Sequence, residues 1–158
     1  MPSGDVTGKP MRLRAGTEED LPRIRALLEA EDLPISDLAT SAPQFLVACD
    51  GSHQVIAAGG LQWFGKTALL RSVVVAPLAR GAGVGRRVLL ALESAARDGN
   101  AAQLVLLTLT AKTFFERQGY RIVDRRSVPE DVQASAEFKS LCPASAICMA
   151  KVFVGSEA

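Results

Sequence analysis

The segment Ala68–Ala76 constrains the fold of this chain more than any other, because almost every residue in it is apolar. A strand of this composition is expected in the middle of a sheet, with both faces covered by other parts of the chain. Pro77 ends the segment, and a glycine-rich turn, Gly81–Gly85, comes shortly after it. Apolar residues then recur at helical spacing from Val84 until Gly99. A central strand that leads through such a turn into a helix predicts an α/β layer structure.

Strand and helix patterns fill the rest of the chain. Asp50-Gly51 and Phe64–Thr67 are turn sequences between apolar runs, so each predicts a hairpin. We expect further strands over residues 11–15, 44–49, 55–64, 103–108, 120–124 and 144–153, and further helices after Thr17 and over residues 111–118 and 129–138. No repeat, low-complexity segment or interdomain linker separates these elements. The sequence therefore predicts one domain over residues 11–158, behind a polar and mobile tail at residues 1–10.

The composition argues against several classes of protein. The 18 basic residues nearly balance the 17 acidic ones, so nothing in the charge favours a nucleic-acid partner. No run approaches the ~20 apolar residues of a membrane span, and no membrane partner is expected. Cys49, Cys142 and Cys148 form an odd set without close spacing, and His53 is the only histidine, so we expect neither disulfides nor a metal site. These features predict a cytoplasmic protein with reduced thiols.

Residues Gly60–Thr67 match the P-loop pattern G-x-x-x-x-G-K-[ST] of nucleotide-binding proteins. A P-loop needs a helix after it, because the N–H groups of the loop and of the helix N-terminus must converge on a phosphate. Here Lys66-Thr67 leads into the central strand instead, and the interior of the segment is bulky and strand-forming. We interpret Gly65-Lys66 as the tip of a hairpin.

The turn Arg80–Gly85 favours a different phosphate site. A dinucleotide motif would begin at Gly81, but Arg86 stands at its last glycine position, and residues 100–113 contain no acidic residue to bind a ribose. The turn as it stands lets the backbone approach a diphosphate closely, and Arg80, Arg86 and Arg87 add positive charge. The same pattern also fits an ordinary strand-to-helix connection with surface arginines.

Three segments resemble, in order, the GNAT superfamily of N-acetyltransferases: Arg71–Pro77, Arg80–Gly85 and Ala111–Tyr120. In that superfamily the first segment is the strand beside the cofactor, the second binds the diphosphate of acetyl-CoA, and the third is a helix near the acyl thioester. The resemblance implies acetyl-CoA as the cofactor. It also implies an α/β (α+β) fold with a central mixed, mostly antiparallel, twisted sheet flanked by helices, and a homodimer, which is frequent in the superfamily.

The resemblance further implies which residues contact the cofactor. The backbone of Val73–Val75 would pair with the pantetheine chain like an added strand, and the Val75 N–H would bind the thioester oxygen. The implied contacts are Val73, Val74, Val75, Arg80, Gly81, Ala82, Gly83, Val84, Gly85, Arg86, Phe114 and Phe115.

A narrower resemblance concerns the amine acceptor. Residues 69–75, 106–110 and 137–145 are similar to arsenic-resistance N-acetyltransferases, and related enzymes acetylate phosphinothricin or its arsenic analogue, arsinothricin. The likeness implies that the substrate is a small amino acid or a toxic glutamate analogue, and that the activity serves detoxification.

Four polar residues are candidates for binding such a substrate. Arg71 would clamp an anionic group with two parallel hydrogen bonds, and Ser72, Thr108 and Thr110 would bind the same molecule. From the residues alone, a surface ion pair explains Arg71 equally well, and strand propensity explains the two threonines.

The implied reaction is direct attack of a neutral amine on the thioester, which needs no protein nucleophile. A water chain that ends at Glu29, Glu31 or the Ser72 hydroxyl would accept the amine proton. An amino-acid α-amine has a pKa of about 8, so an appreciable fraction is already neutral near pH 7 and no dedicated base is required.

The acid of the reaction is less defined, because the tyrosine that protonates the thiolate in many members falls on Phe115, which has no proton to donate. The thiolate would leave unassisted, or Tyr120, Ser145 or Cys142 would serve as the acid. Two other functions stay open: acetylation of a protein or peptide amine, and a non-catalytic CoA- or thiol-based metalloid sensor.

Overall fold

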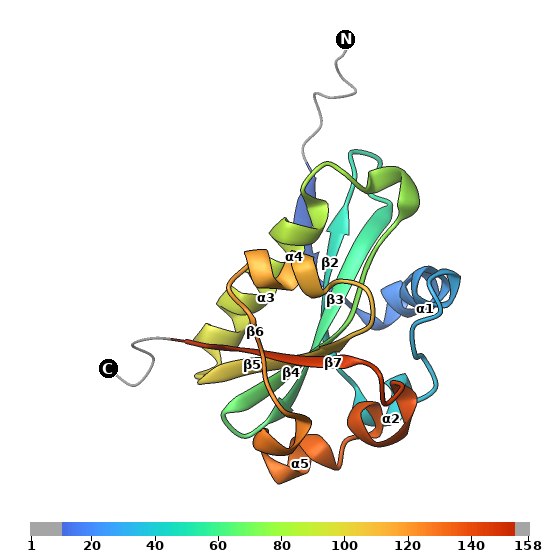
Figure 1. The fold of residues 1–158 in the computed structure, drawn as a ribbon. Coiled ribbons are helices and arrows are strands. Elements are labelled where there is room, and N and C mark those ends of the chain that lie inside the picture. Colours follow the sequence, from blue (N-terminus) through green and yellow to red (C-terminus); the bar gives the residue numbers. More distant parts are fainter. Residues whose placement is uncertain (1–10, 154–158) are drawn as a thin grey trace. The chain divides into compact units, whose positions relative to one another are not determined.

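The computed structural model describes residues 11–153, and its seven strands form one sheet in the order β1-β2-β3-β4-β5-β7-β6 (Figure 1). The strands are β1 (Arg12–Ala15), β2 (Gln44–Cys49), β3 (Val55–Phe64), β4 (Thr67–Val75), β5 (Gln103–Thr108), β6 (Arg121–Ile122) and β7 (Ile147–Val152). The α-helices are α1 (Leu21–Ala30), α2 (Leu38–Ser41), α3 (Val84–Asp98), α4 (Lys112–Arg117) and α5 (Glu130–Gln133). The other helical segments are η2 (Glu18–Asp20), η3 (Pro77–Ala79), η4 (Arg125–Ser127) and η5 (Glu137–Leu141).

The strand pairing confirms the predicted mixed sheet. β1 pairs antiparallel with β2, and β7 pairs antiparallel with both β5 and β6, whereas β4 and β5 are parallel. The observed β2, β3 and β5 begin and end at the residues expected from the sequence. The tail expected at residues 1–10 lies outside the described residues.

The P-loop-like segment forms a hairpin. β3 ends at Phe64 and β4 begins at Thr67, and between them Gly65 has a φ of +61°. A left-handed glycine at the tip is typical of tight hairpins. Because a strand and not a helix follows Lys66, the segment lacks the helix N-terminus on which phosphate binding depends, and the hairpin interpretation is confirmed.

The chain packs as two compact units, and the division passes through β3, β4 and α3. Of the described residues, 11–35, 44–60 and 72–92 form the first unit, and 36–43, 61–71 and 93–153 form the second.

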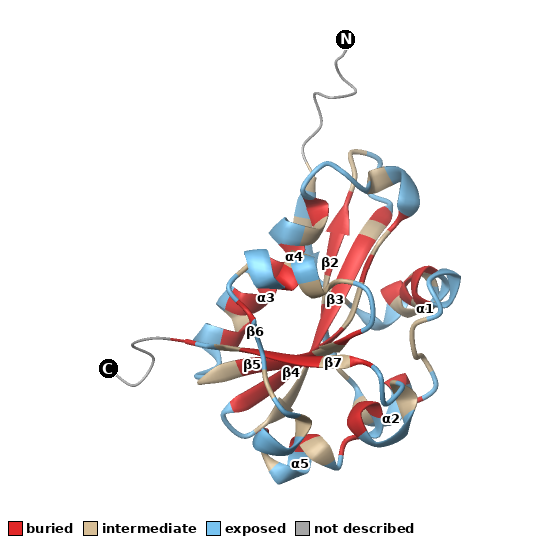
Figure 2. Ribbon diagram, viewed as in Figure 1, coloured by how far each residue is buried: buried red, intermediate tan, exposed pale blue. Residues whose placement is uncertain are grey.

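In the first unit, α1 is held firmly at both ends. At its start, Asp20 accepts hydrogen bonds from the Thr17 N–H (2.8 Å) and from the Arg14 guanidinium (2.8 and 2.9 Å). At its end, Asp32 is left-handed, with a φ of +58°, and the Leu33 N–H donates to the Leu28 carbonyl at 2.9 Å. This is a Schellman-type end, which caps the last carbonyls of the helix. Figure 2 shows that α1 is buried on one side and exposed on the other.

Close packing in the same unit explains Gly59 on β3. A Cβ atom at this position would lie 2.6 Å from the Leu92 Cδ1 atom of α3, a distance that real Cβ atoms do not show. Val88 and Leu92 of α3 are fully buried. The missing side chain of Gly59 therefore lets α3 approach the strand, and this fixes the start of α3 relative to β3.

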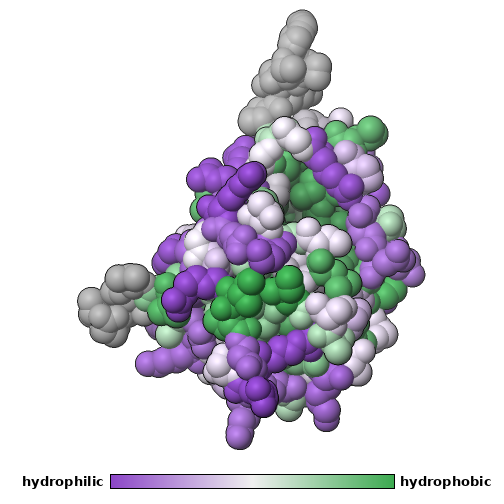
Figure 3. Space-filling model, in the orientation of Figure 1, coloured by the Kyte–Doolittle hydropathy of each residue, from purple (hydrophilic) through white to green (hydrophobic). Residues whose placement is uncertain are grey.

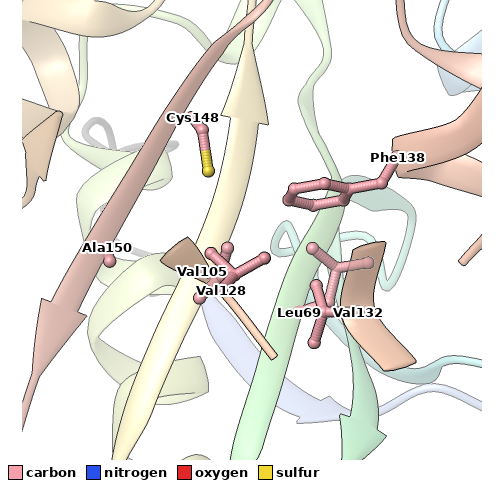
Figure 4. Packing of buried hydrophobic residues seen from close by; sticks show 7 residues of the cluster. All are labelled: Leu69, Val105, Val128, Val132, Phe138, Cys148 and Ala150. Carbon is pink, nitrogen blue, oxygen red and sulfur yellow. The ribbon is translucent and has the colours of Figure 1, made fainter. Parts of the chain in front are cut away.

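The second unit has its own apolar core around β5 and β7. Its buried members are Leu69, Val105, Val128, Val132, Phe138, Cys148 and Ala150 (Figure 4). The Phe138 ring lies beside Leu69 and Val132, so the segment after α5 covers the parallel pair β4–β5. This core holds β7 between β5 and β6 (Figure 1).

The structure corrects the helix expected over residues 129–138. α5 ends at Gln133, and η5 begins only at Glu137. Between them the Ser135 hydroxyl donates to the Val132 carbonyl at 2.6 Å and accepts from the Phe138 N–H at 3.4 Å. A serine that bonds the local backbone in this way competes with the helical hydrogen bonds, which accounts for the break.

The last two expected strands are shorter than predicted. β6 covers only Arg121–Ile122, although the Val123 N–H still donates to the Cys148 carbonyl at 2.9 Å. β7 starts at Ile147 because the Ala146 N–H closes a turn onto the Pro143 carbonyl at 3.0 Å. The turn uses a donor that a longer strand would need.

The described residues form neither a membrane-spanning helix nor a cluster of three metal-binding side chains. Cys49, Cys142 and Cys148 are free thiols. The face seen in Figure 3 is largely hydrophilic, with smaller hydrophobic areas. The large apolar side chains exposed in the described part are Leu78, Leu90, Leu109, Ile122 and Val152.

Candidate functional site

The glycine-rich turn lies in the first unit and opens directly into α3. Gly81 and Gly83 have φ values of +87° and +77°, which side chains rarely adopt. A Cβ atom built on either glycine would meet no heavy atom within 4 Å, so the space in front of both is open. The Arg87 N–H donates to the Gly83 carbonyl at 3.1 Å, and this bond closes the first turn of α3. The N–H groups of that first turn have no acceptor within the helix and favour an anion.

Arg80 stands at the entrance of this turn, in a defined position. Its Nε atom donates to the Val75 carbonyl at 3.1 Å, and its Nη2 atom lies 2.7 Å from a carboxylate oxygen of Glu31. The Arg80 side chain is nevertheless 49% exposed. Arg86 and Arg87 are exposed at the start of α3. The turn thus combines open backbone, a helix N-terminus and fixed positive charge, and these residues fit a diphosphate.

The end of β4 leads into this turn through a distorted backbone. Ser72 has a φ of +58° within the strand, a conformation that costs a residue other than glycine about 1–3 kcal/mol. The ladder between β4 and β5 runs from Thr67 to Leu69, so Val73–Val75 lie beyond its end. Val74 is buried, whereas Val73 and Val75 are half-buried. Strained residues of this kind often mark functional positions, and this one directly precedes the three expected pantetheine contacts.

Arg71 belongs to the second unit and lies in a buried cluster of charges. Its Nη1 and Nη2 atoms donate to the two Asp37 carboxylate oxygens at 2.6 and 2.7 Å, and its Nε atom lies 3.5 Å from a Glu137 oxygen. Its side chain is 0% exposed, so the alternative of a surface ion pair is wrong. Asp37 makes the bidentate contact that was expected from an anionic substrate. A substrate-binding role for Arg71 stays a prediction.

Glu137 is the carboxylate with the most perturbed acidity in this cluster. Burial raises its pKa from 4.5 to about 7, Arg71 opposes the shift and Asp37 adds to it. Burial is the main cause, and Arg71 offsets it only in part because it faces two carboxylates. Since Asp37 already neutralises the guanidinium, a second buried negative charge is unfavourable.

We expect this group to make the folded state more stable at mildly acidic pH. Between about pH 4.5 and 7 the folded chain keeps a proton on Glu137 that the unfolded chain has released, so raising the pH lowers stability. The stabilisation is fully present below pH 4.5 and is lost as the pH rises through 7, in total on the order of 3 kcal/mol. Glu137→Gln should remove this dependence of the free energy of unfolding on pH, and it should be the more stable protein at pH 8. Urea unfolding between pH 5 and 8 would measure both effects.

Two other groups set the limits of that experiment. The pKa of Asp20 is lowered to about 2 by Arg14, and that of Asp37 is lowered by Arg71, so their stabilising contributions are lost only as the pH falls below 3.8. The matched control is Glu130→Gln, which removes an exposed carboxylate of α5. Its free energy of unfolding should change with pH as in the wild type. If the stability of Glu137→Gln changed with pH as in the wild type, Glu137 would not be the source of the pH dependence.

The remaining predicted residues of the second unit lie near α4. Thr108 is buried, and its hydroxyl accepts a hydrogen bond from the Ala111 N–H at 3.0 Å, whereas Thr110 is exposed after β5. Phe114 is half-buried and Phe115 is buried, and their rings meet edge to face with centroids 5.1 Å apart. Thr108 therefore has a structural role at the start of α4, which leaves Thr110 as the freer of the two threonines.

Tyr120 lies under this helix in a buried hydrogen-bonded group. Its hydroxyl donates to a Glu93 oxygen at 2.8 Å, and both Glu93 oxygens lie 3.2 Å from Lys151 Nζ. Burial, reinforced by Glu93, raises the pKa of Tyr120 far above its usual value. The Tyr120 proton therefore has an acceptor within the protein, and its role as the catalytic acid stays a prediction.

The sequence interpretation missed Asp37, Glu93, Glu137 and Lys151. Glu93 was the most detectable, because it follows Leu92 on α3, between the apolar positions Leu89 and Ala96. A carboxylate at such a position is nearly always paired. Nothing in the sequence indicated that its partners would come from residues 120 and 151.

Comparison with known proteins supports the fold. Residues 41–122, just over half of the chain, match the family model described as Acetyltransferase (GNAT) domain, while comparison with curated proteins gives no match. The matched range includes β4, the glycine-rich turn and α3.

Solved structures share this fold at low sequence identity. N-acetylglutamate synthase from Neisseria gonorrhoeae, complexed with coenzyme A and N-acetylglutamate, has a TM-score of 0.76 at 19% identity, over 90% of this chain and 35% of that one. Rv2747 from Mycobacterium tuberculosis, in complex with CoA, has a TM-score of 0.77 at 23% identity, over 90% and 99%. PaiA N-acetyltransferase from Thermoplasma acidophilum, in complex with coenzyme A, has a TM-score of 0.67 at 15% identity, over 91% and 99%. The chain spans about a third of the length of the synthase.

Proposed function

Because the chain belongs to the GNAT acetyltransferase domain family, we propose that it is an acetyl-CoA-dependent N-acetyltransferase. The observation that carries this proposal is the turn Gly81–Gly85, which has open space before two left-handed glycines and leads into the N-terminus of α3. Its backbone N–H groups, with Arg80 and Arg86, would hold the diphosphate of CoA. Val73–Val75 would pair with the pantetheine chain, and Phe114 and Phe115 would supply apolar contacts.

In the proposed reaction the amine nitrogen attacks the thioester carbonyl carbon. The C–N bond forms, the C–S bond breaks, the nitrogen releases one proton, and the CoA thiolate leaves and takes up a proton. The Val75 N–H would stabilise the developing oxyanion, and the strained Ser72 would hold this part of the strand in place. Tyr120 is the proposed acid, although a thiol with a pKa of about 8.5 leaves readily without one.

For the acceptor we propose a small amino acid or a glutamate analogue of the phosphinothricin or arsinothricin type, handled in the cytoplasm as a detoxification step. Support comes from the likeness to N-acetylglutamate synthase, whose structure contains N-acetylglutamate, and from the narrower resemblance of residues 69–75, 106–110 and 137–145. The proposed substrate contacts are Arg71, Ser72, Thr108 and Thr110. A homodimer is part of the proposal.

Acetyl-CoA turnover tests the function. Thiol release would be measured with glutamate, phosphinothricin, arsinothricin and a peptide amine as acceptors, and acceleration by at least one of the three amino acids is the expected result. Acceleration by the peptide alone would favour the protein-acetylating alternative.

CoA binding without acceleration by any amine would favour the sensor alternative. One observation weighs against a thiol-based sensor: burial raises the pKa of Cys142 and of Cys148 to about 11, so neither is a thiolate at neutral pH.

A further inference from the structure

The ion pair between Arg80 and Glu31 joins the glycine-rich turn to the end of α1 within the first unit. The Arg80 Nη2 atom lies 2.7 Å from Glu31 Oε2, while Arg80 Nε donates to the Val75 carbonyl at 3.1 Å. The guanidinium is therefore fixed from two sides, by the backbone of β4 and by a carboxylate. Glu31 is one candidate for the base at the end of a water chain, and it has no other role in the cofactor site predicted from the sequence.

Glu31 is itself held on a rigid frame. It is the last residue before the left-handed Asp32, and the Glu31 N–H donates to the Leu28 carbonyl at 3.1 Å. Leu28 is fully buried, and the capped end of α1 closes directly over it. The position of the Glu31 carboxylate thus depends on a packed helix end and not on a free loop.

Some N–H donors of Arg80 have no partner among residues 11–153. A guanidinium has five N–H groups, and Val75 and Glu31 engage Nε and Nη2 only. Among residues 11–153 the structure gives no acceptor for Nη1 of Arg80, and the side chain is 49% exposed. The two Nη1 donors are therefore available to a ligand at the adjacent turn.

We propose that Glu31 is a positioning residue, which braces Arg80 so that its free donors meet the diphosphate of CoA. The inference rests on the proposed function and adds to it a link between α1 and cofactor binding. Without the brace, Arg80 would have to lose the freedom of its long side chain when the cofactor binds. The opposing effect is repulsion between Glu31 and the phosphates, which is weak because the carboxylate is partly exposed and screened by salt.

The test is calorimetric titration of CoA into Glu31→Gln, Arg80→Ala and the double variant. We expect Glu31→Gln to weaken CoA binding about three- to tenfold and to have almost no further effect once Arg80 is replaced. In turnover assays KM for acetyl-CoA should rise more than kcat falls, whereas loss of a base for the amine proton would appear mainly as a lower kcat. Glu19→Gln, an exposed carboxylate of η2 in the same unit, is the charge control and should bind CoA like the wild type.

Two results would overturn the inference. Tighter CoA binding by Glu31→Gln would mean that Glu31 competes with the cofactor, and an equal loss with and without Arg80 would mean that Glu31 acts by another route. If the wild-type protein binds no CoA, the proposed function fails and the inference fails with it. If the wild type binds CoA and Glu31→Gln binds it equally well, the inference alone fails.

Discussion

Replacing Arg71 with methionine is expected to lower the free energy of unfolding by about 3–5 kcal/mol. The substitution leaves the Asp37 carboxylate without the two hydrogen bonds of 2.6 and 2.7 Å that it accepts from Arg71, and it leaves Glu137 facing Asp37 without a cation between them. Both carboxylates are buried, so water cannot replace the guanidinium. Urea unfolding at pH 7, followed by circular dichroism, would measure the loss.

The chain offers a matched control in the pair Arg14–Asp20. Arg14 also holds an aspartate with two hydrogen bonds, of 2.8 and 2.9 Å, but its side chain is 45% exposed. Arg14→Met should therefore cost about 1 kcal/mol or less, because the Arg14 guanidinium is half exposed and water can take its place beside Asp20. Similar losses for the two variants would show that burial of the Arg71 cluster contributes little.

A further variant separates a structural role of Arg71 from a role in substrate binding. Arg71→Lys keeps a positive charge in the cluster but loses the planar fork that contacts both Asp37 oxygens. If Arg71 serves only the fold, the folded fraction of the lysine variant should keep its kcat/KM for the amine acceptor. A folded variant with a strongly raised KM for the acceptor would support the substrate-binding role predicted from the sequence.

The parts of the fold that the sequence predicted well are those with local signals. β2, β3 and β5 were placed to the residue because apolar runs end at recognisable turns, Asp50-Gly51 and Phe64–Thr67 among them. The prediction of one helix over residues 129–138 was wrong because the residues around Ser135 are compatible with a helix. The break results from the hydrogen bonds of the Ser135 hydroxyl with Val132 and Phe138. Local patterns fix strands and turns, whereas the fate of a single hydroxyl depends on packing.

The candidate site divides in the same way. The conformation of the glycine-rich turn was predictable because glycine adopts a positive φ readily, and the φ values of Gly81 and Gly83 are positive. The partners of Arg71 were not predictable, since Asp37 and Glu137 are far from it in the sequence. Distance along the chain also hid the contact between Tyr120 and Glu93. Long-range pairing of charges therefore has to be read from the structure.

Gly83→Glu is expected to weaken CoA binding by at least about 100-fold, on the order of 3 kcal/mol, while the protein stays folded. The structure has room for the new side chain, because a Cβ atom at Gly83 would meet nothing within 4 Å. That open space is where the diphosphate is proposed to bind, so the glutamate would fill it and repel the phosphates. Calorimetric titration of CoA would measure the loss.

Gly65→Glu separates this effect from backbone strain, because the two glycines share a positive φ and open surroundings. Gly65 also has a positive φ, of +61° against +77° for Gly83, and a Cβ atom there would likewise meet nothing within 4 Å. Both variants add one negative charge and force a side chain into the left-handed region, so they should lose a similar stability of about 1–2 kcal/mol. Gly65 lies at the hairpin tip, and its variant should bind CoA normally. Equal CoA affinities for the two folded variants would exclude the turn Gly81–Gly85 as the cofactor site, since strain and charge would then account for everything observed.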